Sequence, residues 1–135
     1  MFWARTSSVV GGPLLVVVLL AAGLRYDLFH RMAYYDLFMH ALGGIVVAAS
    51  TAGLAWRMQT ARGAFSKTSG TLTVLPFAVV VLVSLLWEAI EVLLGMTPNW
   101  TQSIGDTLSD LLYALAGAVL MLCFIRVQLR RIQQL

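Results

Sequence analysis

Apolar residues fill four long runs of this chain, and short polar stretches separate them. The runs cover about residues 6–24, 36–56, 76–95 and 106–125. A helix rises 1.5 Å per residue, so about 20 apolar residues cross the hydrocarbon core of a bilayer, which is about 30 Å thick. The pattern predicts an all-α integral membrane bundle of four transmembrane helices, with residues 1–135 forming one domain.

The first run also has the features of a secretory signal peptide. Arg5 precedes it, its apolar core is short, and Ala21-Ala22-Gly23 lies at its end. These features leave open whether residues 1–24 are cleaved. We favour an uncleaved span, because a helix from about residue 6 to residue 24 is just long enough to cross. The tyrosines and arginines of residues 25–35 suit an interfacial segment.

Composition excludes an ordinary soluble protein. Hydrophobic residues make up 60% of the chain and charged residues only 11%, and the mean hydropathy is +0.87. The single cysteine, Cys123, excludes an intrachain disulfide and a cluster of thiolate ligands. The net charge of +3 does not indicate nucleic-acid binding, because the basic residues lie in short stretches between apolar runs.

The basic residues predict the orientation. Cytoplasmic loops of membrane proteins are enriched in lysine and arginine. Four spans with both termini in the cytoplasm place seven of the nine basic residues inside: Arg5, Arg57, Arg62, Lys67, Arg126, Arg130 and Arg131. The other two, Arg25 and Arg31, are at the outer side. We therefore expect a multi-pass protein of the bacterial inner (cytoplasmic) membrane, with all its acidic residues at the outer ends of the spans.

Several residues near the ends of the runs carry their own predictions. Pro76 suits the first turn of the third span, where a missing N–H does no harm. Ser103, three residues before Asp106, resembles a capping-box start of the fourth. Residues 57–70 are predicted to be a polar loop and residues 97–100 a turn. Small residues indicate close helix packing at Gly44 with Ala48, at Ala114 with Ala118, and at Gly117.

Ionisable side chains recur at one depth on three of the predicted helices. Asp36 and His40 are four residues apart and Glu88 and Glu91 three apart, so each pair shares a helical face. A carboxylate near the middle of a bilayer costs about 2.5–3.5 kcal/mol on insertion scales. Such residues are expected to face one another inside the bundle. The candidate site comprises Asp36, His40, Glu88, Glu91, Asp106 and Asp110.

Each member also has a purely structural interpretation. Asp36 and Asp106 could be acids at helix starts, and Asp110 could accept a hydrogen bond from Tyr113 or Ser109. His40 could bridge two helices. Capping does not account for Glu88 and Glu91, because the dipole disfavours acids near a helix C-terminus. We therefore favour a functional site.

Carboxylates in close quarters must bind a cation, share protons or pair with a base. Oxygen ligands with one imidazole suit a divalent metal such as zinc, manganese, iron or magnesium, without selecting one. All six residues of the candidate site are possible ligands. With a metal-bound water as nucleophile, Glu88 or Glu91 is the candidate general base.

Three ordered motifs resemble those of the VanZ-like and YjdF-like families of small bacterial membrane proteins. They are Asp36-x-x-x-His40-x-x-x-Gly44, then Glu88-x-x-Glu91, then Asp106 and Asp110 before Gly117-Ala118. The chain has no Gln after Glu91 and no Arg shortly before Asp106, so the YjdF-like variant is closer. The resemblance implies a helical protein of four or five spans.

Three functions remain open at this point. The first is an outward-facing metal site that acts on, or recognises, a lipid or lipid-linked substrate of the cell envelope. The second is an accessory subunit of a larger membrane complex or a homo-oligomer. The third is a proton- or cation-coupled transporter, which would need polar residues through the full depth of the membrane. The inner halves of the predicted spans contain few of them.

Overall fold

A computed structural model describes residues 5–32, 34–61, 70–94 and 104–133. These residues form α1 (Thr6–Arg25), α2 (Leu28–Arg31), α3 (Tyr35–Ala61), α4 (Thr71–Leu94) and α5 (Ile104–Gln133). All but the short α2 are long and apolar enough to cross a membrane. The all-α fold with four candidate spans is therefore confirmed.

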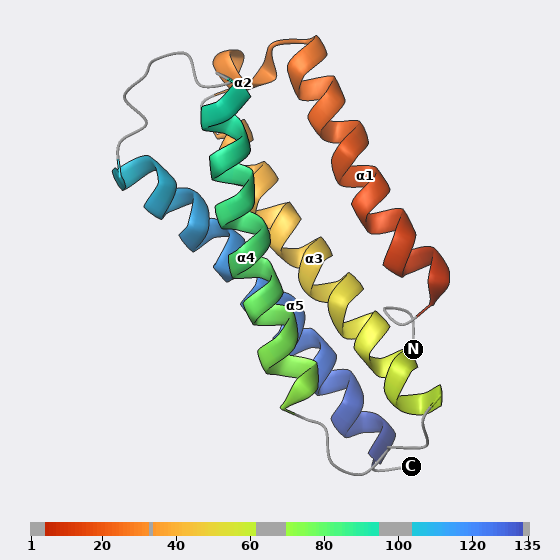
Figure 1. Ribbon diagram of the computed structural model, residues 1–135. Helices are drawn as coiled ribbons and strands as arrows, with labels where there is room; N and C mark the ends of the chain where they lie inside the picture. Colours follow the sequence, from red (N-terminus) through yellow and green to blue (C-terminus); the bar gives the residue numbers. More distant parts are fainter. Residues whose placement is uncertain (1–4, 33, 62–69, 95–103, 134–135) are drawn as a thin grey trace.

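The helix α3 is the centre of the bundle, and α1, α4 and α5 all pack against it (Figure 1). The helix α5 crosses behind α4 and makes the most extensive contact with α3. The end of α1, the short α2, the start of α3, the end of α4 and the start of α5 all lie at one end of the bundle. Acids from three helices can therefore reach the same depth.

The close approach of α3 and α5 depends on two glycines. A Cβ atom added to Gly44 would collide with the backbone carbonyl of Ala114, and one added to Gly117 would collide with that of Ala41. Ala48 and Ala118 are fully buried beside them. The predicted packing through small residues is confirmed. These small residues let the backbones of α3 and α5 come into contact. Such van der Waals packing stabilises helix association in lipid, where the hydrophobic effect does not drive it.

The helix α1 lies at the edge of the bundle and is tied to α3 by polar contacts. The Tyr35 hydroxyl donates to the Leu19 carbonyl at 2.7 Å, and the Ser50 hydroxyl donates to the Val9 carbonyl at 3.0 Å. The Arg57 guanidinium donates to the Thr6 hydroxyl. The chain turns from α1 into α2 at Asp27, whose φ of 56° is in the left-handed region that aspartate tolerates.

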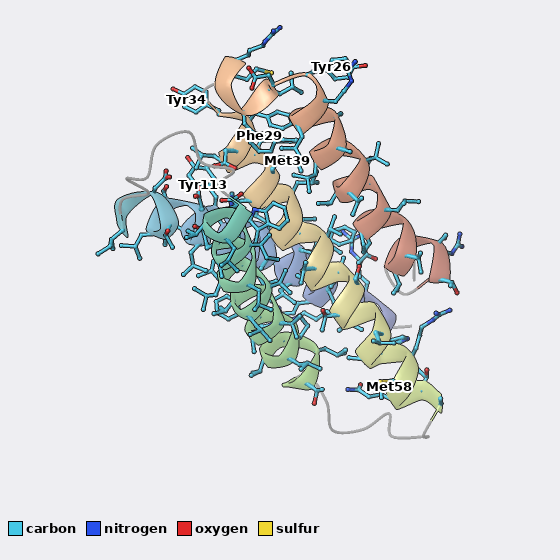
Figure 2. The ribbon with its side chains drawn as sticks, turned by 45° about the horizontal axis from the view of Figure 1, so that its top comes forward. Tyr26, Phe29, Tyr34, Met39, Met58 and Tyr113 are labelled. Atoms are coloured by element: carbon cyan, nitrogen blue, oxygen red, sulfur yellow. The ribbon has the colours of Figure 1, made fainter. Side chains whose placement is uncertain are left out.

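Many large apolar side chains of the described helices point outward. Figure 2 shows the exposed side chains of Tyr26 and Tyr34 at the α2 end and of Met58 near the opposite end. Many large apolar residues of α1 and α4 are more than half exposed, including Leu14, Val74 and Leu93. On helices that cross a membrane, such surfaces face lipid.

Some predicted helix boundaries were wrong. Pro76 is the sixth residue of α4, not part of its first turn, and it is buried. Its missing N–H leaves the Leu72 carbonyl without its usual helical donor, an arrangement that membrane helices tolerate when neighbouring groups compensate. The helix α3 continues to Ala61, and α5 continues to Gln133, because arginine, methionine and glutamine are good helix formers. The predicted roles of Ser103 and residues 97–100 lie outside the described residues.

Candidate functional site

The imidazole of His40, in the second turn of α3, lies among three carboxylates that come from three helices. Its Nε2 atom is 3.6 Å from Asp36 Oδ1, 3.9 Å from Glu88 Oε1 and 3.8 Å from Asp110 Oδ2. His40 and Glu88 are each 7% exposed, whereas the Asp36 side chain is 37% exposed. A protonated imidazole would offset only one of these three negative charges.

Helix geometry brings these residues together. Asp36 is one turn before His40 on α3, so both side chains lie on one face. Glu88 and Glu91 share a face of α4 in the same way, and both are buried. The close contact of α3 with α5 at Gly44 and Gly117 brings α5 near enough for Asp110 to reach His40.

Two side chains that the sequence analysis did not assign to the site hold the glutamates. The Thr107 hydroxyl donates to Glu88 Oε2 at 3.0 Å, and Trp87 Nε1 donates to Glu91 Oε1 at 2.5 Å. Hydrogen bonds to an ionised carboxylate are stronger than neutral ones. The sequence could have indicated that both lie on the same helical faces as the acids, because Thr107 is three residues before Asp110 and Trp87 is four before Glu91.

Asp110 is the most deeply buried acid of the site. It is 1% exposed, and neither of its carboxylate oxygens has a hydrogen-bond partner among the described residues. The alternative in which Asp110 accepts a hydrogen bond from Tyr113 or Ser109 was therefore wrong: Ser109 donates to the Asp106 carbonyl instead, at 2.7 Å. A buried carboxylate is expensive unless it is paired, protonated or bound to a cation.

Asp106 differs from the other predicted site residues. It is in the first turn of α5, where a negative charge suits the helix dipole, and it is exposed. It belongs to neither group of described side chains that could hold an ion together. The expectation that all six residues face one another inside the bundle was therefore wrong for Asp106. One turn further along α5, Asp110 points inward.

Two overlapping groups of side chains offer ligand atoms within 4.8 Å of one another. One is Asp36, His40 and Asp110, and the other is His40, Glu88 and Glu91. The distances of 3.6–3.9 Å from His40 exceed those of hydrogen bonds. Ligands about 2.1 Å from a tetrahedral zinc ion lie about 3.4 Å apart, so the ligand atoms of either group would have to move closer together to bind a metal. The donor set of one imidazole and several carboxylates also fits such an ion.

The fold and the site define a class: a small polytopic membrane protein with a buried His/acid cluster near one end of its bundle. The family model "Predicted membrane protein (DUF2238)" matches residues 6–131, and the chain belongs to that family. No curated protein and no solved structure matches the chain. The resemblance to the VanZ-like proteins stays a prediction.

Proposed function

We propose that the protein binds one divalent metal ion at the buried cluster and presents it to a lipid or lipid-linked substrate at the outer side of the membrane. Asp110 carries this proposal. It is nearly inaccessible, it has no hydrogen-bond partner among the described residues, and it lies beside an imidazole that already faces two other carboxylates. A divalent cation neutralises this excess of negative charge more completely than His40 alone.

Asp36, His40 and Asp110, the first of the two groups, would hold the ion. A bound zinc, manganese, iron or magnesium ion would supply Lewis acidity and lower the pKa of a coordinated water. Glu91 accepts a hydrogen bond from Trp87 and belongs to the other group, so it would not be a ligand of an ion held by Asp36, His40 and Asp110. It is our candidate for the base that takes a proton from a nucleophile, in keeping with the role of a carboxylate at such sites.

The test is elemental analysis of protein purified in detergent without added metal. We compare wild type with Asp110→Asn, which keeps the shape of the side chain and removes its charge. The control is Asp27→Asn, because Asp27 is an exposed acid outside both groups and asparagine tolerates its left-handed backbone. We expect about one ion per chain in wild type and control, and affinity reduced at least 10–100-fold in Asp110→Asn.

Two results would overturn the proposal. One is a wild-type protein that contains no metal and takes up none when zinc or manganese is added. The other is an Asp110→Asn variant that keeps its full metal content. The first would favour a cluster whose carboxylates share protons, and the second would place the metal at residues other than Asp110.

A further inference from the structure

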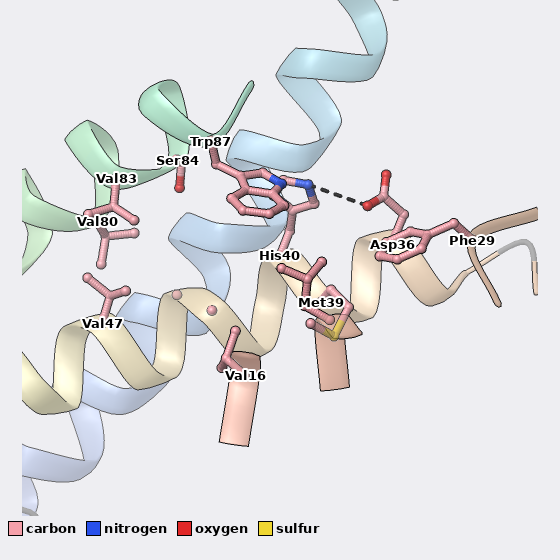
Figure 3. A pocket seen from close by; sticks show the side chains of 13 residues that line it. Val16, Phe29, Asp36, Met39, His40, Val47, Val80, Val83, Ser84 and Trp87 are labelled. Carbon is pink, nitrogen blue, oxygen red and sulfur yellow. Dashed lines mark ion pairs between the residues drawn. The ribbon is translucent and has the colours of Figure 1, made fainter. Parts of the chain in front are cut away.

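A cavity of about 140 Å³ adjoins the cluster on the side that faces α1. Residues of α1, α2, α3 and α4 line it, and its walls are almost entirely apolar. Figure 3 shows Val47, Val80 and Val83 at one end, Asp36 at the other and His40 between them. Since Val47 is seven residues after His40, the cavity extends about 10 Å along α3 from its polar end.

Gly43 is part of the wall, and its missing side chain keeps the cavity open. A Cβ atom added to Gly43 would meet nothing within 4 Å, whereas one added to the adjacent Gly44 would strike the Ala114 carbonyl. Glycine inside a helix costs about 1 kcal/mol relative to alanine. Close packing with α5 offsets that cost at Gly44. At Gly43 the described structure shows only open space.

We propose that this cavity takes one hydrocarbon chain of a phospholipid-type lipid, whose phosphate lies toward Asp36 and His40. The volume suits a short segment of a single chain, since a cavity of about 150 Å³ accepts a hydrocarbon the size of benzene. An apolar cavity of this kind excludes water, and at membrane depth the available apolar solute is a lipid chain. The chain enters from the bilayer between α1 and α4, which both pack on α3.

The position of the phosphate rests on the proposed metal site. Asp36 and His40 line the cavity and also belong to one of the two groups that could hold an ion. An ion bound there is therefore accessible from the cavity, and phosphate oxygens are good ligands for divalent cations. Without the ion, the carboxylates would repel a phosphate. The cavity and the metal site together define the class of substrate: a phospholipid-type lipid whose hydrocarbon chain enters the cavity while its phosphate binds the ion.

The experiment uses photoactivatable phosphatidylglycerol in vesicles of phosphatidylglycerol and phosphatidylethanolamine. One probe carries a diazirine in the middle of its acyl chain, and a second carries it next to the head group. After illumination, mass spectrometry locates the labelled residues. We expect the mid-chain probe to label the region of Val47, Val80 and Val83, and the head-group probe to label the region of Asp36 and Trp87.

The variants separate occupancy of the cavity from contact with surrounding lipid. Gly43→Leu fills the cavity and should reduce its labelling about tenfold, which corresponds to about 1.4 kcal/mol. Gly11→Leu is the control, because Gly11 also has open space at its Cβ but does not line the cavity. It should label like wild type. Val83→Phe fills the cavity from the α4 wall and provides a second test should Gly43→Leu fold poorly.

Equal labelling of the cavity residues in wild type and both filled variants would overturn the chain proposal. Labelling of the valine end by the head-group probe would overturn the orientation of the lipid. The metal content of the same samples is measured separately. If no sample binds metal, the proposed function fails and the phosphate position with it, while the labelling pattern still decides whether a chain occupies the cavity.

Discussion

Two adjacent glycines of α3 have opposite surroundings. Gly44 is buried against the backbone of α5, and Gly43 borders a cavity. Their roles differ because neighbouring positions on a helix point about 100° apart. The sequence shows two identical residues side by side, and only the positions of α4 and α5 distinguish the one that packs from the one that leaves space.

We expect Gly44→Ala to destabilise the protein and Gly43→Ala to leave its stability unchanged or slightly raised. The new methyl group at Gly44 would force α3 and α5 apart, and overpacking of this kind costs about 1–3 kcal/mol. At Gly43 the methyl group enters open space, and alanine is the better helix former. Thermal unfolding in detergent measures both. A Gly44→Ala variant as stable as wild type would show that α3 and α5 pack less closely than described.

For individual residues, the sequence predicted correctly which acids in the middle of the site are buried, but it did not predict which acid at the edge of the site stays exposed. The cost of charge in lipid indicates that Glu88, Glu91 and Asp110 must face inward, and these three are buried. The same reasoning failed for Asp106, because a residue in the first turn of a helix can remain exposed at the end of the bundle. Helical spacing alone does not locate the end of the membrane-embedded part of a helix.

Among the helices, α1 is the least embedded. Of an apolar stretch of 18 residues in each helix, 6% is buried inside the bundle in α1 and 39% in α3. Its link to α3 includes two interhelical hydrogen bonds to backbone carbonyls, from Tyr35 and Ser50. The apolar pattern predicted α1 as a span. The hydrogen-bond donors that hold it were not predicted, because their acceptors are carbonyl groups that every residue carries.

We expect the double variant Tyr35→Phe, Ser50→Ala to loosen α1 while the rest of the bundle stays folded. Interhelical hydrogen bonds in membrane proteins average about 0.6 kcal/mol, so the loss should be about 1 kcal/mol. Amide hydrogen exchange should rise in α1 and remain unchanged in α5. Thr60→Val is the control, because it removes a hydrogen bond from Thr60 to the Arg57 carbonyl within α3. Unchanged exchange in α1 would show that apolar contacts alone hold it.

Over the whole molecule, the His/acid cluster and most of the described basic residues lie toward opposite ends. The His/acid cluster lies near the α2 end, and the C-terminal parts of α3 and α5, which carry Arg57, Arg126 and Arg130, lie toward the other. Away from the cluster, the core of α3 and α5 consists of residues such as Ala52, Leu122 and Ile125. This division favours a site that is accessible from one side and from the surrounding lipid over a path through the bundle.

The basic residues predict that the α2 end faces away from the cytoplasm. Reporter fusions test this orientation. A fluorescent protein joined after Ala61 should be fluorescent, because it remains in the cytoplasm. Alkaline phosphatase joined after Leu94 should be active, because it is exported. The exchanged pair of fusions is the control and should give little signal. If the exchanged pair gives the strong signals, the site faces the cytoplasm.

The order of the helices also has a consequence for how the protein is made. His40 and Asp36 emerge from the ribosome with α3, Glu88 follows with α4, and Asp110 comes only with α5. Until that last helix inserts, the carboxylates of α4 are at membrane depth without Thr107 beside them, at a cost of about 2.5–3.5 kcal/mol per charge on insertion scales. Insertion of α5 therefore completes both the fold and the site.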